Sequence, residues 1–124
     1  MKKQLNIGLV AHDAMKEKLA DWAKAHADKL ERHNLFGTGT TSSVLMKSVP
    51  GLKITALKSG PLGGDQQLGA MICDGKLDML VFFQDVMTSQ PHDVDVKALI
   101  RMSTLYDIPI ACNMATAEII ADRL

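Results

Sequence analysis

Residues Met79–Phe83 read MLVFF, a run of consecutive apolar residues between the polar flanks Asp78 and Gln84. A strand that is buried on both faces has this composition, because both of its sides contact the rest of the protein. A second run of this kind, Leu5–Ala11 (LNIGLVA), stands near the start of the chain. Two such strands predict a parallel sheet that is covered by helices on both faces.

Helical and strand patterns alternate along the rest of the chain. Apolar residues recur at helical spacing from Met15 to Leu30, with Asp13 placed to cap that helix. Further strands are expected at Leu35–Gly37, Leu52–Leu57 and Ile108–Cys112, and further helices from the TGTTSS turn (38–43) to about Val49 and at Gln66–Cys73, Val96–Tyr106 and Ala115–Leu124. Because parallel strands need crossovers, residues 1–124 are predicted to form one α/β domain with three layers, a flavodoxin-like fold whose five-stranded, mostly parallel sheet lies between helices.

Composition excludes several classes of protein. The 124 residues carry 14 Lys and Arg against 14 Asp and Glu, whereas binding to nucleic acid or to anionic membranes requires a basic surplus. No apolar run approaches the roughly 18 residues of a membrane span, and the run after Lys2 and Lys3 is too short for a signal peptide. Cys73 and Cys112 belong to no CxxC motif, which predicts reduced, buried thiols in a cytoplasmic protein.

Polar or Gly-rich residues follow every expected strand. They are His12 and Asp13 after the first, TGTT (38–41) after the second, SGPLGGDQQ (59–67) after the third, Gln84–Asp95 after the fourth and Asn113 after the fifth. Ligands of open α/β sheets bind beyond the carboxyl ends of the strands, where these loops converge. We therefore predict a small-molecule site on this face.

The second of these loops has the composition of an anion site. The hydroxyl groups of Thr38, Thr40 and Thr41, next to Gly39, precede a helix whose first amides are free to bind phosphate. The alternative is that these threonines only cap the helix. Lys16 is placed to reach the same anion, or else it faces solvent.

The third loop offers a candidate base. Asp65 stands at the expected start of a helix, whose positive end would keep its carboxylate ionised, as a general base requires; the alternative is a plain N-cap. Ser59 and Gly60 lie where the backbone is able to approach a ligand closely. After the fourth strand, a carboxylate such as Asp95 is placed to orient His92 toward a substrate. No strong metal-ligand spacing occurs, so no metal is predicted.

The sequence resembles the methylglyoxal synthase family. The matching segments are VAHDAMK in the first loop, GTGTTS in the second, SGPLGGDQQLGA in the third, VFFQD at the fourth strand, PHDVDVKALIR after it and IPIACNMATAE at the end. They occur in the order of the family and cover nearly the whole chain.

The resemblance implies a reaction: dihydroxyacetone phosphate is converted to methylglyoxal and inorganic phosphate without a metal or organic cofactor. It also implies the roles of individual residues. The base would be Asp65, the substrate contacts would be His12, Lys16, Thr38, Gly39, Thr40, Thr41, Ser59, Gly60 and His92, and the supporting catalytic carboxylates would be Asp13, Asp85 and Asp95. A homohexamer that is inhibited by phosphate is expected on the same ground.

The chain departs from the family pattern at two places in these loops. Ser42 stands where the family commonly has glycine, and Val86 and Met87 follow Asp85 where the family commonly reads Pro-Leu. Members also usually continue beyond the last helix.

The competing function is a regulatory module of the same fold that binds a metabolite without converting it. The presence of Asp65 together with the PHD segment at 91–93 favours the enzyme.

Overall fold

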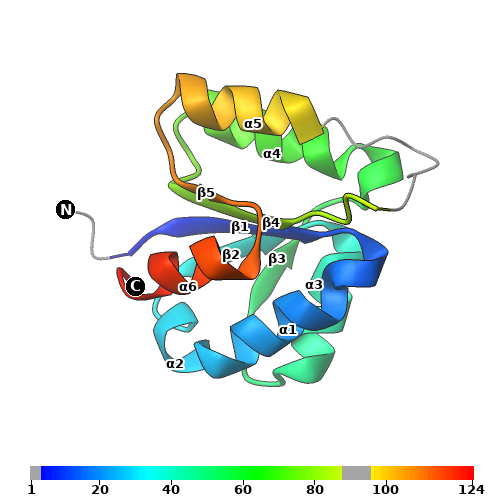
Figure 1. The fold of residues 1–124 in the computed structure, drawn as a ribbon, viewed down its shortest axis with the longest axis vertical. Coiled ribbons are helices and arrows are strands. Elements are labelled where there is room, and N and C mark those ends of the chain that lie inside the picture. Colours follow the sequence, from blue (N-terminus) through cyan, green and yellow to red (C-terminus); the bar gives the residue numbers. More distant parts are fainter. Residues whose placement is uncertain (1–3, 88–95) are drawn as a thin grey trace.

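A single parallel sheet forms the centre of the computed structural model, which describes residues 4–87 and 96–124 (Figure 1). The strand order is β3-β2-β1-β4-β5, and every neighbouring pair in the described residues is parallel. The strands are β1 (Asn6–Ala11), β2 (Asn34–Gly37), β3 (Ile54–Ala56), β4 (Met79–Phe83) and β5 (Ile110–Ala111). The predicted α/β class is confirmed.

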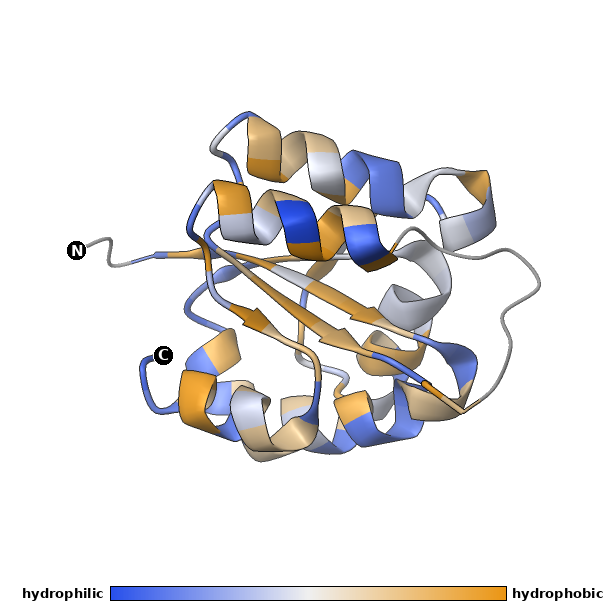
Figure 2. Cartoon of the chain, turned by 45° about the horizontal axis from the view of Figure 1, so that its top comes forward, coloured by the Kyte–Doolittle hydropathy of each residue, from blue (hydrophilic) through white to orange (hydrophobic). Residues whose placement is uncertain are grey.

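Helices cover both faces of the sheet. Helices α4 and α5 lie on one face, and α1, α2, α3 and α6 lie on the other (Figure 1). The helices are α1 (Lys16–Ala25), α2 (Ala27–Leu30), α3 (Gly39–Ser48), α4 (Gly64–Cys73), α5 (Val96–Leu105) and α6 (Met114–Ala121), and single 3₁₀ turns occupy η1 (Asp13–Met15) and η2 (Gly60–Leu62). Figure 2 shows hydrophobic residues concentrated in the strands between these layers.

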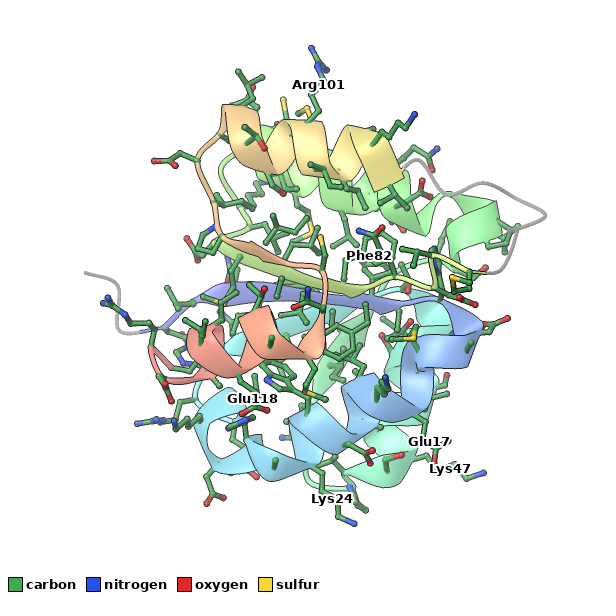
Figure 3. All side chains as sticks on the ribbon, in the orientation of Figure 1. Glu17, Lys24, Lys47, Phe82, Arg101 and Glu118 are labelled. Carbon is green, nitrogen blue, oxygen red and sulfur yellow. The ribbon has the colours of Figure 1, made fainter. Side chains whose placement is uncertain are left out.

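The two central strands are buried on both faces, as their composition predicts. Side chains alternate along a strand, so Ile7 and Leu9 of β1 join one apolar cluster, with Trp22 of α1, while Val10 joins the other. Phe82 of β4 is fully buried in this second cluster and points toward the α4–α5 layer (Figure 3). The sheet therefore separates two cores.

The order of the strands creates a crevice. β1 pairs with β2 on one side and with β4 on the other, so the chain reverses its direction of travel across the sheet at this point. The backbone N–H of His12 donates to the carbonyl of Phe83 (3.1 Å), which holds the carboxyl ends of these two strands together. Loops that leave the ends of β1 and β4 separate to opposite faces, and open α/β sheets bind ligands at such a switch point.

Several predicted boundaries differ from the structure at the first helix. The segment from Met15 to Leu30 is divided, because the backbone of His26 leaves helical geometry (φ −116°, ψ 22°) between α1 and α2. Asp13 lies inside η1 rather than at an N-cap, so the predicted capping role is wrong. Its carboxylate instead contacts the ammonium group of Lys16.

Several later elements have other bounds than predicted: β3, β5 and α6 are shorter, whereas α4 begins two residues earlier. β3 and β5 lie at the sheet edges, and Pro109 has no N–H with which to extend β5 toward Ile108. Helix α6 begins at Met114, because the side chain of Asn113 accepts the N–H of Thr116 (2.9 Å) and caps it.

Both cysteines are free thiols, but the prediction that both are buried is wrong. Cys73 is exposed and Cys112 is partly buried. Cys73 follows the buried Ile72 on α4, and one residue corresponds to about 100° around a helix, which turns its side chain away from the core. The Cys73 thiol lies 3.5 Å from the hydroxyl of Tyr106, and this hydrogen bond raises the pKa of Tyr106.

Over the described residues, no helix has the length and apolar character of a membrane span.

Glycines at the start of α4 bring two loops into contact. Gly63 adopts a left-handed conformation (φ 103°), which glycine tolerates best. A Cβ atom at Gly64 would lie 1.9 Å from the carbonyl oxygen of Lys58, so only glycine fits there without moving the backbone. The SGPLGG segment therefore owes its close packing on α4 to these two positions.

We predict opposite effects for two Gly→Ala substitutions in α4. Gly64→Ala should lower the free energy of unfolding by about 1–3 kcal/mol, because its Cβ would overlap the backbone of Lys58. Gly69→Ala should raise it by up to about 1 kcal/mol, because a Cβ there meets only ordinary contacts and alanine favours the helix. Urea denaturation of both variants measures the difference; equal stabilities would contradict the predicted backbone contact.

Candidate active site

A cavity of about 60 Å³ lies beyond the carboxyl end of β1, at the switch point of the sheet. It is lined by Val10, Ala11, His12, Asp13, Lys16, Thr38, Thr40, Gly60, Pro61 and Asp65. This volume corresponds to roughly two water molecules in the liquid, so the cavity suits a small group rather than a dinucleotide. A larger hollow of about 690 Å³ lies at the start of β2 and β3, and none of the residues that line it is a predicted site residue.

Asp65 is the buried carboxylate of this cavity. It is 6% exposed and lies in the first turn of α4, where the positive end of the helix stabilises negative charge. The N-cap of α4 is Gly63, so the alternative that Asp65 is a plain cap is wrong. No side chain in the described part of the chain donates a hydrogen bond to its carboxylate. Burying a carboxylate without such partners is costly, which is a reason to look for a function.

Lys16 provides the positive charge at the cavity wall. Its side chain is only 12% exposed, so the alternative that Lys16 simply faces solvent is wrong. Its ammonium group pairs with the carboxylate of Asp13, which is itself 97% exposed. An ion pair with one partner in water is weak, so an anion in the cavity is able to compete for the ammonium group.

The threonine turn divides into two parts with different surroundings. Thr38 and Thr40 line the cavity, whereas Gly39 and Thr41 do not. Thr41 is 1% exposed, and its hydroxyl accepts the N–H of Ala11 (3.3 Å) and donates to the carbonyl of the same residue (3.4 Å). Thr38 donates to the Thr41 hydroxyl (3.1 Å) and makes no capping bond to α3. Thr41 therefore connects α3 to β1 by hydrogen bonds. The alternative that these threonines only cap the helix is wrong, because the side chain at the N-cap makes no capping bond.

His12 is held in one orientation and one tautomer. Its Nδ1 accepts the backbone N–H of Asp85 (2.8 Å), and its ring packs edge-on against Phe82 at 5.3 Å between centroids. An accepting Nδ1 carries no hydrogen, so the neutral ring carries its proton on Nε2. Asp85 thus acts on His12 through its main chain, while its carboxylate accepts the N–H of Met87 (3.1 Å).

The remaining predicted residues have other positions. Gly60 lines the cavity, whereas Ser59 does not; the carbonyl of Ser59 accepts the N–H groups of Leu62 and Gly64 (both 3.0 Å) and so closes the turn beside it. Asn113 caps α6. His92 and Asp95 lie outside the described residues. Within residues 4–87 and 96–124, no three His, Cys, Asp or Glu side chains are grouped so that they could hold a metal ion.

The structure also brings together residues that the sequence prediction did not include. Val10 and Pro61 line the cavity, and the side chain of Gln67 contacts the loop that precedes Gly60. Gln67 belongs to the predicted SGPLGGDQQ loop, but nothing in its spacing indicated a partner nine residues earlier in the chain. Contacts of this kind depend on how the loop folds back on the helix.

The fold and the cavity define an α/β domain with a small, charged site at its switch point, and comparison with known proteins gives the family. The family model described as "MGS-like domain" matches residues 18–112. A methylglyoxal synthase of Agrobacterium fabrum is 53% identical over 98% of this chain and 96% of its own length, and one of Oleidesulfovibrio alaskensis is 55% identical over 95% and 80%. The crystal structure of methylglyoxal synthase from Elizabethkingia anophelis matches with a TM-score of 0.92 and 46% identity, covering 98% of this chain and 79% of that one. The chain belongs to the methylglyoxal synthase family.

We predict that neighbouring threonines differ in their effect on stability. Thr41→Val should lower the free energy of unfolding by about 1–3 kcal/mol, because it leaves buried main-chain groups of Ala11 without their hydroxyl partner. Thr40→Val should change it by less than about 0.5 kcal/mol, because Thr40 is exposed. Chemical denaturation tests both variants; a Thr41→Val variant as stable as Thr40→Val would show that the contact of α3 with β1 is unimportant.

Proposed function

We propose that this chain is an enzyme that converts dihydroxyacetone phosphate to methylglyoxal and inorganic phosphate. The observation that carries the proposal is the placement of a buried carboxylate, Asp65, and a lysine, Lys16, in the lining of the same small cavity. A base and a cation in one cavity suit a substrate with an acidic C–H bond and a phosphate group. The identity of about half of all residues with methylglyoxal synthases supports this choice of substrate.

The proposed reaction begins with proton transfer. The carboxylate of Asp65 removes a proton from the carbon that bears the hydroxyl group, and the electron pair of the broken C–H bond forms an enediolate with the neighbouring carbonyl. The enediolate re-forms a carbonyl at the carbon that lost the proton, and the electrons of its C=C bond expel phosphate from the third carbon, which breaks the C–O bond to the phosphate group. The enol that remains takes up a proton on the third carbon, gives up its hydroxyl proton and becomes methylglyoxal. The whole reaction is an elimination, as in a carbon–oxygen lyase.

The phosphate group is proposed to bind Lys16, Thr38, Thr40 and Gly60, which line the cavity together with Asp65. These four residues form the proposed phosphate wall. Charge on the phosphate grows as the C–O bond breaks, and preorganised donors stabilise such charge most when it develops. Thr41, Gly39 and Ser59 would then support this binding from behind the cavity wall rather than by contact, which refines the roles implied by the resemblance.

The carbonyl oxygen of the substrate needs a donor as the enediolate forms. The Nε2–H of His12 is proposed as this donor, because the hydrogen bond from the Asp85 main chain to Nδ1 places the ring proton on Nε2. The sequence assigns a related role to His92, with Asp95 as its orienting partner, and this assignment stays a prediction. Asp13 would support phosphate binding indirectly, because its ion pair holds the ammonium group of Lys16 in place.

Several properties of the proposed enzyme stay predictions from the sequence or from the resemblance. They are reaction without a metal or organic cofactor, inhibition by inorganic phosphate, assembly as a homohexamer, location in the cytoplasm, and activity within one domain that comprises residues 1–124. Inhibition follows from the chemistry of the cavity, since the product fits the groups that bind the phosphate of the substrate.

We predict that Asp65→Asn lowers kcat at least about 10²-fold, because an amide cannot accept the proton. The measurement follows methylglyoxal and released phosphate together after addition of dihydroxyacetone phosphate, and the parent should form them in equal amounts. Asp74→Asn is the matched control, since Asp74 is an exposed carboxylate at the other end of α4 and should leave kcat unchanged.

Two results would overturn this proposal. Near-parental turnover of Asp65→Asn would show that Asp65 is not the base. A parent protein that binds phosphate but forms neither product would instead favour the regulatory module, in which the same cavity binds a metabolite without converting it.

A further inference from the structure

The main chain of Lys58 contacts the threonine turn on one side and helix α4 on the other. Its carbonyl accepts the N–H of Gly39 (3.3 Å) from the threonine turn, and its N–H donates to Oε1 of Gln67 (2.8 Å) from α4. The same carbonyl lies against Gly64, where no side chain fits. One peptide segment therefore contacts both the turn that forms part of the proposed phosphate wall and the helix that carries Asp65.

Gln67 is the only side chain among these contacts, since Gly39, Gly64 and Lys58 take part through their main chains. It lies two residues after Asp65 on α4, so its amide moves with the base. Lys58 lies directly before Ser59 and Gly60, so its peptide moves with the loop that contributes Gly60 to the cavity. The hydrogen bond between them fixes the base relative to this loop.

We propose that Gln67 is a positioning residue, whose hydrogen bond to the Lys58 amide sets the distance between the proton-abstracting carboxylate of Asp65 and the phosphate-binding wall. This inference rests on the proposed function, because it assigns a role in that reaction. Proton abstraction and phosphate departure take place on one small molecule, so the two groups must be correctly placed at the same time. Misplacement of a reacting group by about 1 Å is able to cost a large factor in rate, on the order of 10²-fold.

The side chain of Gln67 is exposed, which separates this role from a role in stability. A neutral hydrogen bond at the surface contributes little to the free energy of folding. The contact of Gly39 with the Lys58 carbonyl and the close approach of Gly64 do not involve Gln67. The phosphate wall should therefore keep its shape when the amide is lost, and the start of α4 keeps its contacts through Gly64, while the turn that carries Asp65 loses its side-chain tie to Lys58.

The test compares Gln67→Leu, Gln67→Glu and the parent, with Gln66→Leu as the matched control on the neighbouring exposed position. Leucine removes the acceptor, whereas glutamate keeps an oxygen at the same place. We measure kcat with dihydroxyacetone phosphate, the inhibition constant of inorganic phosphate, and the midpoint of urea unfolding. Should Gln67→Leu fail to fold, Gln67→Ala provides the same comparison.

Gln67→Leu is expected to lower kcat about tenfold, with the phosphate inhibition constant changed by less than about threefold. Gln67→Glu should recover most of kcat, and Gln66→Leu should match the parent. Unchanged kcat in Gln67→Leu, or an equal loss of kcat and phosphate affinity, would overturn the positioning role. A parent without turnover would overturn the proposed function, and with it this inference, so the two failures give different results.

Discussion

The pairing of β1 with β4 is the constraint on which the rest of the structure depends. These strands are buried on both faces and lie side by side although residues 12–78, more than half of the chain, separate them in sequence. Because β2 lies on the other side of β1, the loops that follow β1 and β4 leave the sheet at its switch point. The cavity exists at this place because the sheet reverses its winding there.

The charged groups of the cavity are placed by elements that serve the core as well. Asp65 is carried by α4, whose buried face includes Leu68 and Ile72, and Lys16 is carried by α1, whose buried face includes Trp22. The two helices lie on opposite faces of the sheet (Figure 1). Base and cation therefore approach each other across the end of β1, and changes in either core would alter their separation.

The sequence contained enough information to predict the fold class and most of the cavity. The apolar run Met79–Phe83 and the polar residues after each strand depend on local pattern alone, and they led to the correct class and to Asp65, Lys16 and His12 in one cavity. The burial of Cys73 was predicted wrongly, because the apolar character of a side chain does not determine which side of a helix it occupies. The contact of Gln67 with Lys58 and the tautomer of His12 depend on long-range placement of main-chain amides, which no spacing rule contains.

The proposed reaction requires that phosphate binds in the cavity beside Asp65, between the threonine turn and the Gly60 loop. The most direct measurement is a crystal structure of the protein with inorganic phosphate. The account predicts a phosphate ion with its oxygens roughly 2.7–2.9 Å from the ammonium group of Lys16 and within hydrogen-bond distance of the Gly60 N–H, with Asp65 on the facing wall. Phosphate bound elsewhere on the chain, with the Lys16 ammonium group still paired only with Asp13, would contradict it.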